Sequence, residues 1–338
     1  MTQPPKRIVT LGEVLMRLTP PRFARLEQAN SLEMHFGGGE ANVAMSLAHW
    51  GWQATHVTRF PDHALGHRAV RFLRQWGLNT SAVLWGGARL GVYYSEVGAS
   101  MRASQIVYDR TSSAFADLKA GMIDWEAIFS ESPVDWFHWA GITPALSQGA
   151  ADVCLEAVIA AKKLGIKVSA DIFYRSNLWQ WGKAPQEILP ELTCYTDLVV
   201  AGTGAINLIF GGQSANFAEA CHQLSLQYPN LRWIADTHRT AHSATCNDLS
   251  VTLWTNGSVW QSSTLHIDPI VDRIGGGDAF IAGLMHGLST FDNDPQDALN
   301  FGLAASALKH TVEGDVNLVS LAEVTAIAAG NINGSLKR

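Results

Sequence analysis

The stretch at residues 271–280 reads Val-Asp-Arg-Ile-Gly-Gly-Gly-Asp-Ala-Phe and places three consecutive glycines directly before an aspartate. Several backbone N–H groups can turn toward one point there, because glycine has no Cβ atom. The apolar pattern after Asp278 predicts a helix, whose N-terminus carries a partial positive charge. Such a unit is suited to hold a phosphate, and Asp278 could accept a proton from a hydroxyl beside it. A glycine-rich connection in which Asp278 only caps the helix is the alternative that these residues leave open.

A second glycine cluster lies near the N-terminus. Residues 36–51 read Phe-Gly-Gly-Gly-Glu-Ala-Asn-Val-Ala-Met-Ser-Leu-Ala-His-Trp-Gly, which predicts a helix from Glu40 to Trp50 that ends at Gly51. Helical patterns at residues 66–76 and 149–164 alternate with apolar runs that are typical of buried strands. These runs lie at residues 7–12, 54–58, 136–139, 167–170, 197–200 and 232–235. The alternation favours an α/β fold with a parallel sheet and helices on both faces.

Together, the two glycine clusters resemble the paired signatures of the PfkB (ribokinase-like) family of sugar kinases. The first cluster is similar to the sugar-binding glycine pair and following asparagine of that family, here Gly38 and Asn42. The second is similar to the family pattern D-T-x-G-A-G-D, with Arg273 and Gly276 in place of Thr and Ala. The resemblance implies that Gly38 and Asn42 meet the hydroxyl end of the sugar.

This resemblance covers nearly the whole chain and implies a particular architecture. We expect a single kinase domain over residues 1–338, built as a ribokinase-like three-layer sandwich with a mainly parallel central sheet. Extended patterns at about 13–36 and 90–111 are expected to form a small β lid over the sugar. Ordinary surface hairpins are the alternative for these two segments.

The composition is that of a compact globular protein. The chain has 338 residues, of which 47% are hydrophobic and 16% charged, so it can bury a substantial core. A net charge of −6 without a basic cluster argues against nucleic-acid and anionic-membrane partners. Four widely spaced cysteines are typical of reduced thiols in a cytoplasmic protein. Neither a signal peptide nor a membrane span is predicted, because Glu13 and Arg17 interrupt the apolar opening.

By the same resemblance, the second glycine cluster carries the phosphoryl-transfer chemistry. Asp278 is the candidate catalytic base, which would deprotonate the sugar hydroxyl. The backbone of Gly275, Gly276 and Gly277 would form an anion hole around the transferring phosphoryl group. ATP and Mg²⁺ are the implied cofactors.

Three further segments resemble 2-keto-3-deoxygluconate kinases more than ribokinases, fructokinases or adenosine kinases. They read Ala-Gly-Ile-Thr-Pro-Ala-Leu at residues 140–146, Asp-Ile-Phe-Tyr-Arg-Ser-Asn-Leu-Trp at 171–179 and Val-Tyr-Asp-Arg at 107–110. The implied substrate is a sugar acid, which carries a carboxylate at one end.

The side chains in these segments suit such a substrate. Arginine grips a carboxylate with two hydrogen bonds, and Arg110 and Arg175 would supply two guanidinium groups to the pocket. Tyr93 and Tyr108 could cover the sugar and offer it hydroxyls. A neutral sugar would leave such arginines without a charged partner. Alternatives remain: Arg110 could be an exposed hairpin charge beside Asp109, and the tyrosines could be plain strand aromatics.

Two stretches depart from the family pattern. The usual N-x-x-E motif, which is linked to magnesium and phosphate, is replaced at residues 199–207, where Gly202 and Ala205 hold the two key positions. The metal ligands are therefore unknown from the sequence. The usual nucleotide loop is replaced by residues 236–247, where Arg239 and Ser243 are expected to bind the nucleotide. A solvent-facing Arg239 is the alternative.

The sequence predicts an ATP- and Mg²⁺-dependent kinase that converts 2-keto-3-deoxygluconate to its 6-phosphate. One alternative is a PfkB kinase for another sugar, such as fructose or a different keto-acid. The other is a non-catalytic sugar-binding protein on the same scaffold. The expected partners are a sugar acid, a nucleotide and further copies of the chain in a homodimer or higher homo-oligomer.

Overall fold

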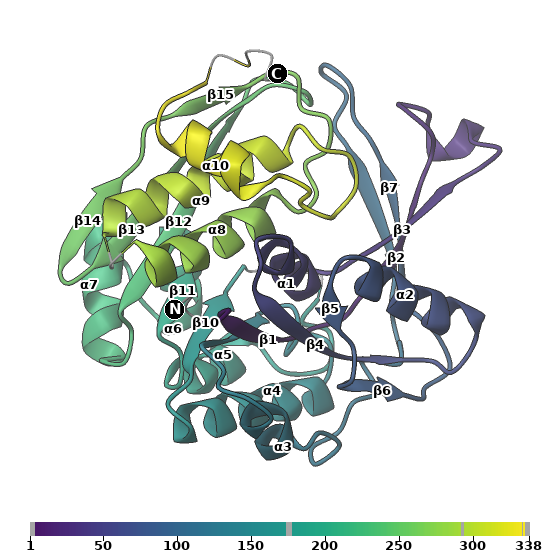
Figure 1. Cartoon of the computed structure of the whole chain (residues 1–338), viewed down its shortest axis with the longest axis horizontal. Helices are drawn as coiled ribbons and strands as arrows, with labels where there is room; N and C mark the ends of the chain where they lie inside the picture. Colours follow the sequence, from purple (N-terminus) through teal and green to yellow (C-terminus); the bar gives the residue numbers. More distant parts are fainter. Residues whose placement is uncertain (1–3, 174–177, 292–293, 333, 335–338) are drawn as a thin grey trace.

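The computed structural model describes residues 4–173, 178–291, 294–332 and 334. Eleven strands among these residues form the central sheet (Figure 1). They are β1 (Arg7–Leu11), β4 (Gln53–Phe60), β5 (Leu78–Asn79), β6 (Val83–Trp85), β9 (Trp136–Ala140), β10 (Lys167–Asp171), β11 (Leu198–Val200), β12 (Trp233–Ala241), β13 (Asn247–Thr255), β14 (Ser258–Gln261) and β15 (Leu265–Ile267). Their order is β14-β13-β12-β11-β10-β9-β1-β4-β5, with β15 beside β13 and β6 beside β4.

The sheet is parallel from β12 to β5, and only β13, β14 and β15 pair in antiparallel fashion within the described part of the chain. Both faces of the parallel part are buried. In β9, for example, Trp136 packs into the core on one side and Phe137 into the core on the other, because successive side chains of a strand point to opposite faces.

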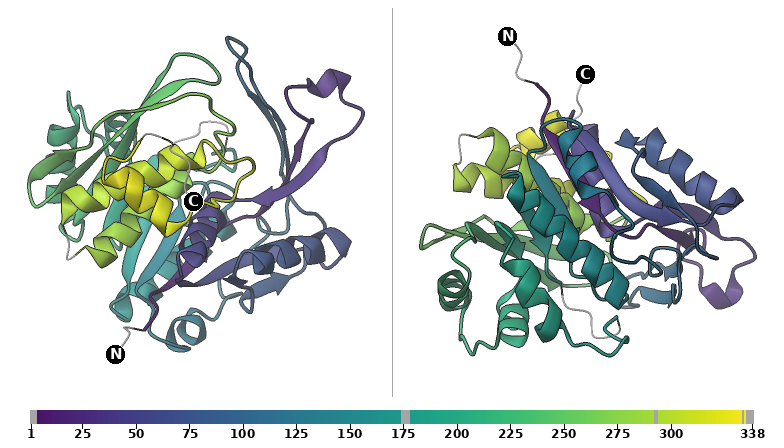
Figure 2. Two further views of the ribbon diagram at one scale, coloured as in Figure 1. Left: turned by 45° about the horizontal axis from the view of Figure 1, so that its top comes forward. Right: turned by 90° about the horizontal axis from the view of Figure 1, so that it is seen from below.

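Helices cover both faces, which gives three layers (Figure 2). One core is shared with α1 (Gly39–His49), α2 (Ala64–Gln75), α8 (Gly276–Thr290), α9 (Pro295–Lys309) and α10 (Leu321–Ala328). The other is shared with α3 (Trp125–Ser130), α4 (Gln148–Lys163), α5 (Pro185–Thr193), α6 (Thr203–Phe210) and α7 (Phe217–Gln227). Among the described residues, no helix has the length and apolar character needed to cross a bilayer.

A second, four-stranded sheet projects from this body (Figures 1 and 2). It consists of β3 (Glu33–Gly37), β2 (Leu15–Thr19), β7 (Val92–Glu96) and β8 (Gln105–Asp109) in that order, and a short 3-10 helix at Leu26–Gln28 lies between β2 and β3. Strands β2 and β7 pair in parallel, whereas the outer pairs are antiparallel. We call these four strands the lid sheet. The fold class predicted from the sequence is thus confirmed.

The topology indicates where a ligand binds. Strand β1 lies between β4 and β9, so the chain builds the sheet in one direction from β1 to β4 and then in the other from β9 to β12. Ligands of open α/β sheets bind at the carboxyl ends of the strands that flank such a reversal. The ends of β1, β9 and β10 are therefore expected to border the site.

Residues 236–247, which replace the usual nucleotide loop of the family, are mostly strand. Strand β12 continues to Ala241 and pairs with β13 in a long hairpin, from Trp233 opposite Thr255 to Ala241 opposite Asn247. Only residues 242–246 connect the two strands. The polar and exposed end of β12 gave no apolar signal, because it extends beyond the helices that cover the sheet.

Candidate active site

A cavity of about 990 Å³ opens at the strand ends that the topology singles out. Its lining comes from Ala140 at the end of β9, Asp171 at the end of β10, the first turns of α1 and α8, and lid strands β7 and β8. The two glycine clusters and the lid sheet, which are distant in the sequence, therefore meet around one space.

The glycine cluster before α8 forms a tight turn. Gly275 is the N-cap residue of α8 and has a φ of 83°, a backbone conformation that favours glycine. A Cβ atom at Gly276 would lie 2.5 Å from Cε1 of His310, so packing against α9 also requires glycine there. Gly277 is exposed, and a Cβ atom there would meet nothing within 4 Å. Protein packing thus explains the first two glycines but not the third.

Asp278 lies in the first turn of α8 and contacts α1. The Asn42 side chain donates a hydrogen bond from Nδ2 to Oδ2 of Asp278 over 2.7 Å. The backbone N–H of Gly38 donates to Oδ1 of Asn42 at 3.4 Å, which orients the amide. A Cβ atom at Gly38 would lie only 2.1 Å from the carbonyl oxygen of Glu13. Gly275 is the N-cap residue of α8, so Asp278 does not occupy the N-cap position of this helix.

A buried charge network ties the lid sheet to the glycine turn. Arg17, on lid strand β2, contacts Oδ2 of Asp272 at 2.8 Å and Oδ2 of Asp315 at 3.2 Å. Tyr93, on lid strand β7, donates its hydroxyl to Oδ1 of Asp315 at 2.7 Å. Burial opposes the charge on Arg17, yet Asp315 and Asp272 together raise its pKa. Burial and then Asp315 raise the pKa of Tyr93.

A second buried cation lies next to the turn. Lys309, at the end of α9, is fully buried and donates from Nζ to the carbonyl oxygen of Val312 at 3.0 Å. A Cβ atom at Gly275 would lie 3.2 Å from its Cε. Burial lowers the pKa of Lys309, whereas Asp272 and Asp315 act in the opposite direction. No role for this lysine was expected from the sequence.

A buried carboxyl group also borders the cavity. Glu40, in the first turn of α1, accepts a hydrogen bond from the Thr143 hydroxyl at 2.7 Å. Burial raises the pKa of Glu40 to about 7, and Asp278 contributes in the same direction. His138 on β9 also lines the cavity, and burial lowers its pKa to about 3. The imidazole of His138 is therefore neutral at ordinary pH.

The lid arginine already has an anionic neighbour. Arg110 donates from Nε to Oε2 of Glu13 at 2.8 Å, and the Ser113 hydroxyl contacts the other oxygen of the same carboxylate. Asp109 instead pairs with Arg89 at 2.7 Å. The alternative of Arg110 as an exposed charge beside Asp109 is thus wrong. The expectation that Arg110 has no charged partner unless an acidic substrate is bound is also wrong, because Glu13 is that partner.

The two tyrosines lie side by side on the lid. Their ring centroids are 5.9 Å apart, and Cζ of Arg110 lies 5.8 Å from the Tyr108 ring. Tyr93 is buried, whereas 41% of the Tyr108 surface is exposed. Both residues line the cavity, so they could contact a molecule bound beneath the lid.

The opposite side of the cavity carries the residues expected at the nucleotide. Arg239 and Asp236 on β12 line it together with Gly202, the N-cap residue of α6. A Cβ atom at Gly202 would lie 2.9 Å from Oδ2 of Asp236. Glycine at the first position of the missing N-x-x-E motif therefore leaves room for an aspartate from the neighbouring strand. Burial raises the pKa of this aspartate, while His238 and the Thr237 N–H oppose the shift.

Arg273 fixes the tip of the β12–β13 hairpin. Its Nη2 donates to the carbonyl oxygens of Ser243 and Ala244 at 2.7 and 2.8 Å and to Oδ1 of Asn247 at 3.1 Å. Ala244 and Thr245 line the cavity, whereas Ser243 does not. Arg273, which stands where the family pattern has threonine, thus holds the tip of this hairpin by hydrogen bonds.

The structure brings most of the predicted site residues to one cavity. The lining includes Gly38, Asn42, Tyr93, Tyr108, Arg110, Arg239, Gly275, Gly277 and Asp278. Gly276 is buried against His310, and neither Gly276 nor Ser243 is among the residues that line the cavity. Arg175 lies outside the described residues. Sequence reasoning missed Glu13, Arg17, Asp236, Lys309 and Asp315, because their roles come from partners that are remote in the chain.

The sandwich, the lid sheet and the glycine turn at a helix N-terminus define a ribokinase-like protein. The chain belongs to the pfkB family of carbohydrate kinases, whose pattern matches residues 5–321. The family assignment made from the two glycine clusters is thereby confirmed.

Relatives with known names are similar to this chain over nearly its whole length. The 2-dehydro-3-deoxygalactonokinase of Haloferax volcanii is 30% identical over 331 residues, which covers 97% of this chain and 98% of the relative. The 2-dehydro-3-deoxygluconokinase of Thermoproteus tenax is 28% identical over 312 residues, or 91% of this chain and 89% of the relative. The crystal structure of a 2-dehydro-3-deoxygluconokinase from Thermotoga maritima superposes with a TM-score of 0.91 at 36% identity, covering 97% and 99% of the two chains. This chain is thus similar to kinases of 2-dehydro-3-deoxy sugar acids.

Proposed function

We propose that this protein transfers a phosphoryl group from ATP to the C6 hydroxyl of 2-keto-3-deoxygluconate. The observation that carries the proposal is the contact between Asn42 and Asp278 beside the glycine turn. It places a carboxylate at a helix N-terminus, where a phosphate is favoured, in a cavity large enough for a sugar acid and a nucleotide. The names of the relatives support the substrate class.

In this proposal Asp278 accepts the proton of the C6 hydroxyl as that oxygen attacks the γ-phosphorus. Asn42 holds the carboxylate in place. It acts as a positioning residue, because an amide does not take up a proton near pH 7. The backbone N–H groups of Gly275, Gly276 and Gly277 stabilise the charge that develops on the phosphoryl oxygens. The missing Cβ at Gly277 would let the phosphate approach closely.

The lid supplies the sugar contacts. Tyr93 and Tyr108 cover the sugar, while Gly38 and Asn42 lie toward its hydroxyl end. Arg110 would bind the substrate carboxylate while its Nε stays with Glu13, because a guanidinium has five N–H donors. Arg175 is proposed as the second carboxylate ligand. Closure of the lid would exclude water and so limit hydrolysis of ATP.

Arg239 is proposed to contact the nucleotide phosphates, and the hairpin tip at Ser243 to shape the wall beside them. The family implies Mg²⁺, and Asp236 fits as a ligand because its carboxylate lines the cavity opposite a glycine. When bound, Mg²⁺ would neutralise part of the phosphate charge. Asp236→Asn should weaken calorimetric binding of Mg²⁺ with a non-hydrolysable ATP analogue at least fivefold and leave sugar affinity unchanged.

A second substrate deserves equal testing. The Haloferax volcanii relative is named for the galactonate epimer, which differs from the gluconate form in the configuration of one hydroxyl. The two sugar acids present the same carboxylate and the same terminal hydroxyl. The residues proposed above therefore do not discriminate between them.

A coupled assay of ADP release tests the proposal. It compares 2-keto-3-deoxygluconate, its galactonate epimer, fructose, ribose and gluconate with Mg²⁺ and ATP. We expect turnover of the two 2-keto-3-deoxy acids in preference to fructose, ribose and gluconate. Preference for a neutral sugar would overturn the carboxylate argument but keep the roles of Asp278 and the glycines.

A non-catalytic sugar-binding protein is the remaining alternative. Asp278→Asn distinguishes it, because the exchange removes the base but keeps the shape and the amide contact with Asn42. We expect turnover to fall by about three to four orders of magnitude, the upper part of the range for general bases. If the unmodified protein shows no measurable turnover and Asp278→Asn binds the sugar as well as the unmodified protein does, the result instead favours a pure binder.

A further inference from the structure

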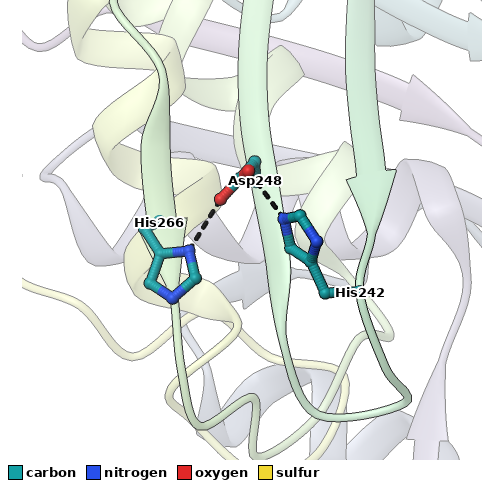
Figure 3. Close-up of side chains that lie close together, drawn as sticks. All are labelled: His242, Asp248 and His266. Carbon is teal, nitrogen blue, oxygen red and sulfur yellow. Dashed lines mark hydrogen bonds and ion pairs between the residues drawn. The ribbon is translucent and has the colours of Figure 1, made fainter. Parts of the chain in front are cut away.

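The outer surface of the β12–β13 hairpin carries a cluster of histidine, cysteine and aspartate side chains that the proposed reaction does not use. Asp248 on β13 lies directly opposite His266 on β15 in the antiparallel register. His242 follows the end of β12 and approaches Asp248 from the other side (Figure 3). Cys246 precedes β13, and Asp268 follows β15. The described residues offer two groups of three metal-type ligands here, and His266 belongs to both.

Interatomic distances show which of the two groups has the spacing of metal ligands. Oδ1 and Oδ2 of Asp248 lie 2.7 Å from Nδ1 of His266 and from Nε2 of His242, respectively. These are ordinary hydrogen-bond lengths. Two such ligands of a tetrahedral zinc ion would be separated by about 3.3 Å, given the usual bond lengths. The first group is therefore a hydrogen-bonded relay of imidazole, carboxylate and imidazole.

The other nitrogen of His266 has a different neighbour. Its Nε2 lies 3.7 Å from Sγ of Cys246. A nitrogen and a thiolate sulfur on one tetrahedral zinc ion are separated by about 3.6 Å, so this pair has the spacing of two ligands. The Asp268 carboxylate completes the group, with ligand atoms that all lie within 4.8 Å of one another.

The relay prepares His266 for this role. Because Asp248 accepts the hydrogen bond from Nδ1, the lone pair of a neutral His266 ring resides on Nε2, which faces Cys246. Histidine ligands of metals usually donate their other N–H to a carboxylate in this way. Sulfur, nitrogen and carboxylate oxygen are together a ligand set that suits zinc better than magnesium or calcium.

We propose that Cys246, His266 and Asp268 form a surface site for a divalent transition metal of the zinc type, with Asp248 as the positioning residue for His266. Solvent completes the coordination. The site is separate from the magnesium role proposed for Asp236 and does not depend on the proposed reaction.

The site would act on the cavity wall. The backbone N–H of Ile270 donates to the carbonyl oxygen of Thr245 at 2.7 Å, and both residues line the cavity. A metal held by Cys246 on one segment and by His266 and Asp268 on the other would cross-link the two segments next to this contact, since Cys246 directly follows Thr245. Bound metal should therefore stabilise this part of the hairpin.

Cobalt binding tests the proposal without any need for turnover. Tag-free reduced protein is titrated with Co²⁺ in the absence of nucleotide, followed by competition with Zn²⁺. We expect a thiolate-to-cobalt charge-transfer band that Cys246→Ser abolishes. Asp248→Asn should weaken Zn²⁺ binding about 10- to 100-fold, the range known for residues that support a ligand. Asp268→Asn, which replaces a ligand itself, should weaken it at least as much.

Matched variants make the test specific. Cys194→Ser changes an exposed cysteine at the C-cap of α5, and His222→Asn changes another exposed histidine. Both variants should bind cobalt like the unmodified protein. His242→Asn should have little effect. Loss of binding in His242→Asn together with a normal spectrum in Cys246→Ser would assign the metal to the other group and overturn the proposal. Absence of a charge-transfer band in the unmodified, folded protein would overturn it as well.

Discussion

A single buried carboxyl group makes the stability of this protein sensitive to pH. Glu40 lies beneath the cavity, accepts a hydrogen bond from Thr143 and has its pKa raised by burial from 4.5 to about 7. In the unfolded chain the group loses its proton near pH 4.5, whereas the folded protein retains it up to about pH 7. Stability from this group is therefore fully present below about pH 4.5 and is lost as the pH rises through 7.

Glu40→Gln should remove the destabilisation that ionisation of the buried Glu40 side chain causes above about pH 7. Gln keeps an oxygen that can accept the hydrogen bond from Thr143 but carries no charge at any pH. We expect the variant to be more stable than the unmodified protein at pH 8 by roughly 1–3 kcal/mol, with little difference at pH 5. Urea unfolding at the two pH values measures the change. An equal effect at both would show that ionisation of Glu40 is not the cause.

Two neighbouring glycines of the turn before α8 should respond differently to the same methyl group. Gly276→Ala brings a Cβ atom to 2.5 Å from His310, so helix α8 or α9 must shift. We expect a loss of about 1–3 kcal/mol of stability, as for other overpacked sites. Thermal unfolding of the variant measures this loss.

Gly277→Ala, by contrast, meets no protein atom within 4 Å. Its stability should stay within about 1 kcal/mol of the unmodified protein, because alanine favours a helix. Turnover should nevertheless fall at least tenfold if the phosphoryl group passes close to this backbone. Full activity in Gly277→Ala would remove residue 277 from the proposed anion hole.

At the scale of elements, the sequence was sufficient for most of the parallel sheet. The predicted helix at 40–50 and strand at 136–139 correspond to α1 and β9, because apolar runs and glycine stops reflect local burial. The end of β12 was missed, since its side chains are exposed and polar from Thr237 onward. The end of β12 is a strand because it pairs with β13, and such pairing leaves no pattern in the local sequence.

The site shows the same division between local and remote information. Asp278 and Asn42 stand in recognisable motifs, so their meeting could be predicted through the family resemblance. The link from Arg17 to Asp272 and Asp315 could not, because its members are spread over almost 300 residues without a shared motif. Likewise, the pairing of Arg110 with Glu13 appears only when the lid is folded against the body.

Arg17 tests how strongly the lid sheet is joined to the body. Replacing it by Met keeps a long side chain but leaves the buried carboxylates of Asp272 and Asp315 without their cation. We expect a loss of about 3–5 kcal/mol of stability, which is usual when one partner of a buried ion pair is removed. Denaturant unfolding measures it, and Arg89→Met serves as a control because its ion pair is largely exposed. A similar small loss in both variants would contradict the proposed coupling.

At the scale of the whole molecule, the lid sheet offers a surface for self-association. Strand β8 is exposed along its length and is one of the two edge strands of this sheet, the other being β3. Val107 is 53% exposed, and its neighbours Ile106 and Tyr108 line the cavity. An open strand edge with apolar side chains is suited to pair with another copy.

We therefore predict a homodimer that pairs through its lid sheets. Val107→Lys should shift the protein from dimer to monomer at micromolar concentration, as measured by light scattering after size-exclusion chromatography. Leu226→Lys changes an apolar residue on α7 that is more exposed than Val107 and should leave the mass unchanged. Identical masses for both variants, or a monomeric unmodified protein, would contradict dimerisation by this surface.

The hydrogen bond between Asn42 and Asp278 joins residues that are 236 positions apart. During synthesis, a ribosome has therefore completed every described strand of the central sheet and of the lid before it adds the proposed base. If Asp278 is that base, a chain that ends before α8 lacks the group that would accept the proton of the sugar hydroxyl. The order of elements along the chain would then keep the proposed activity silent until α8 has been made and has docked against α1.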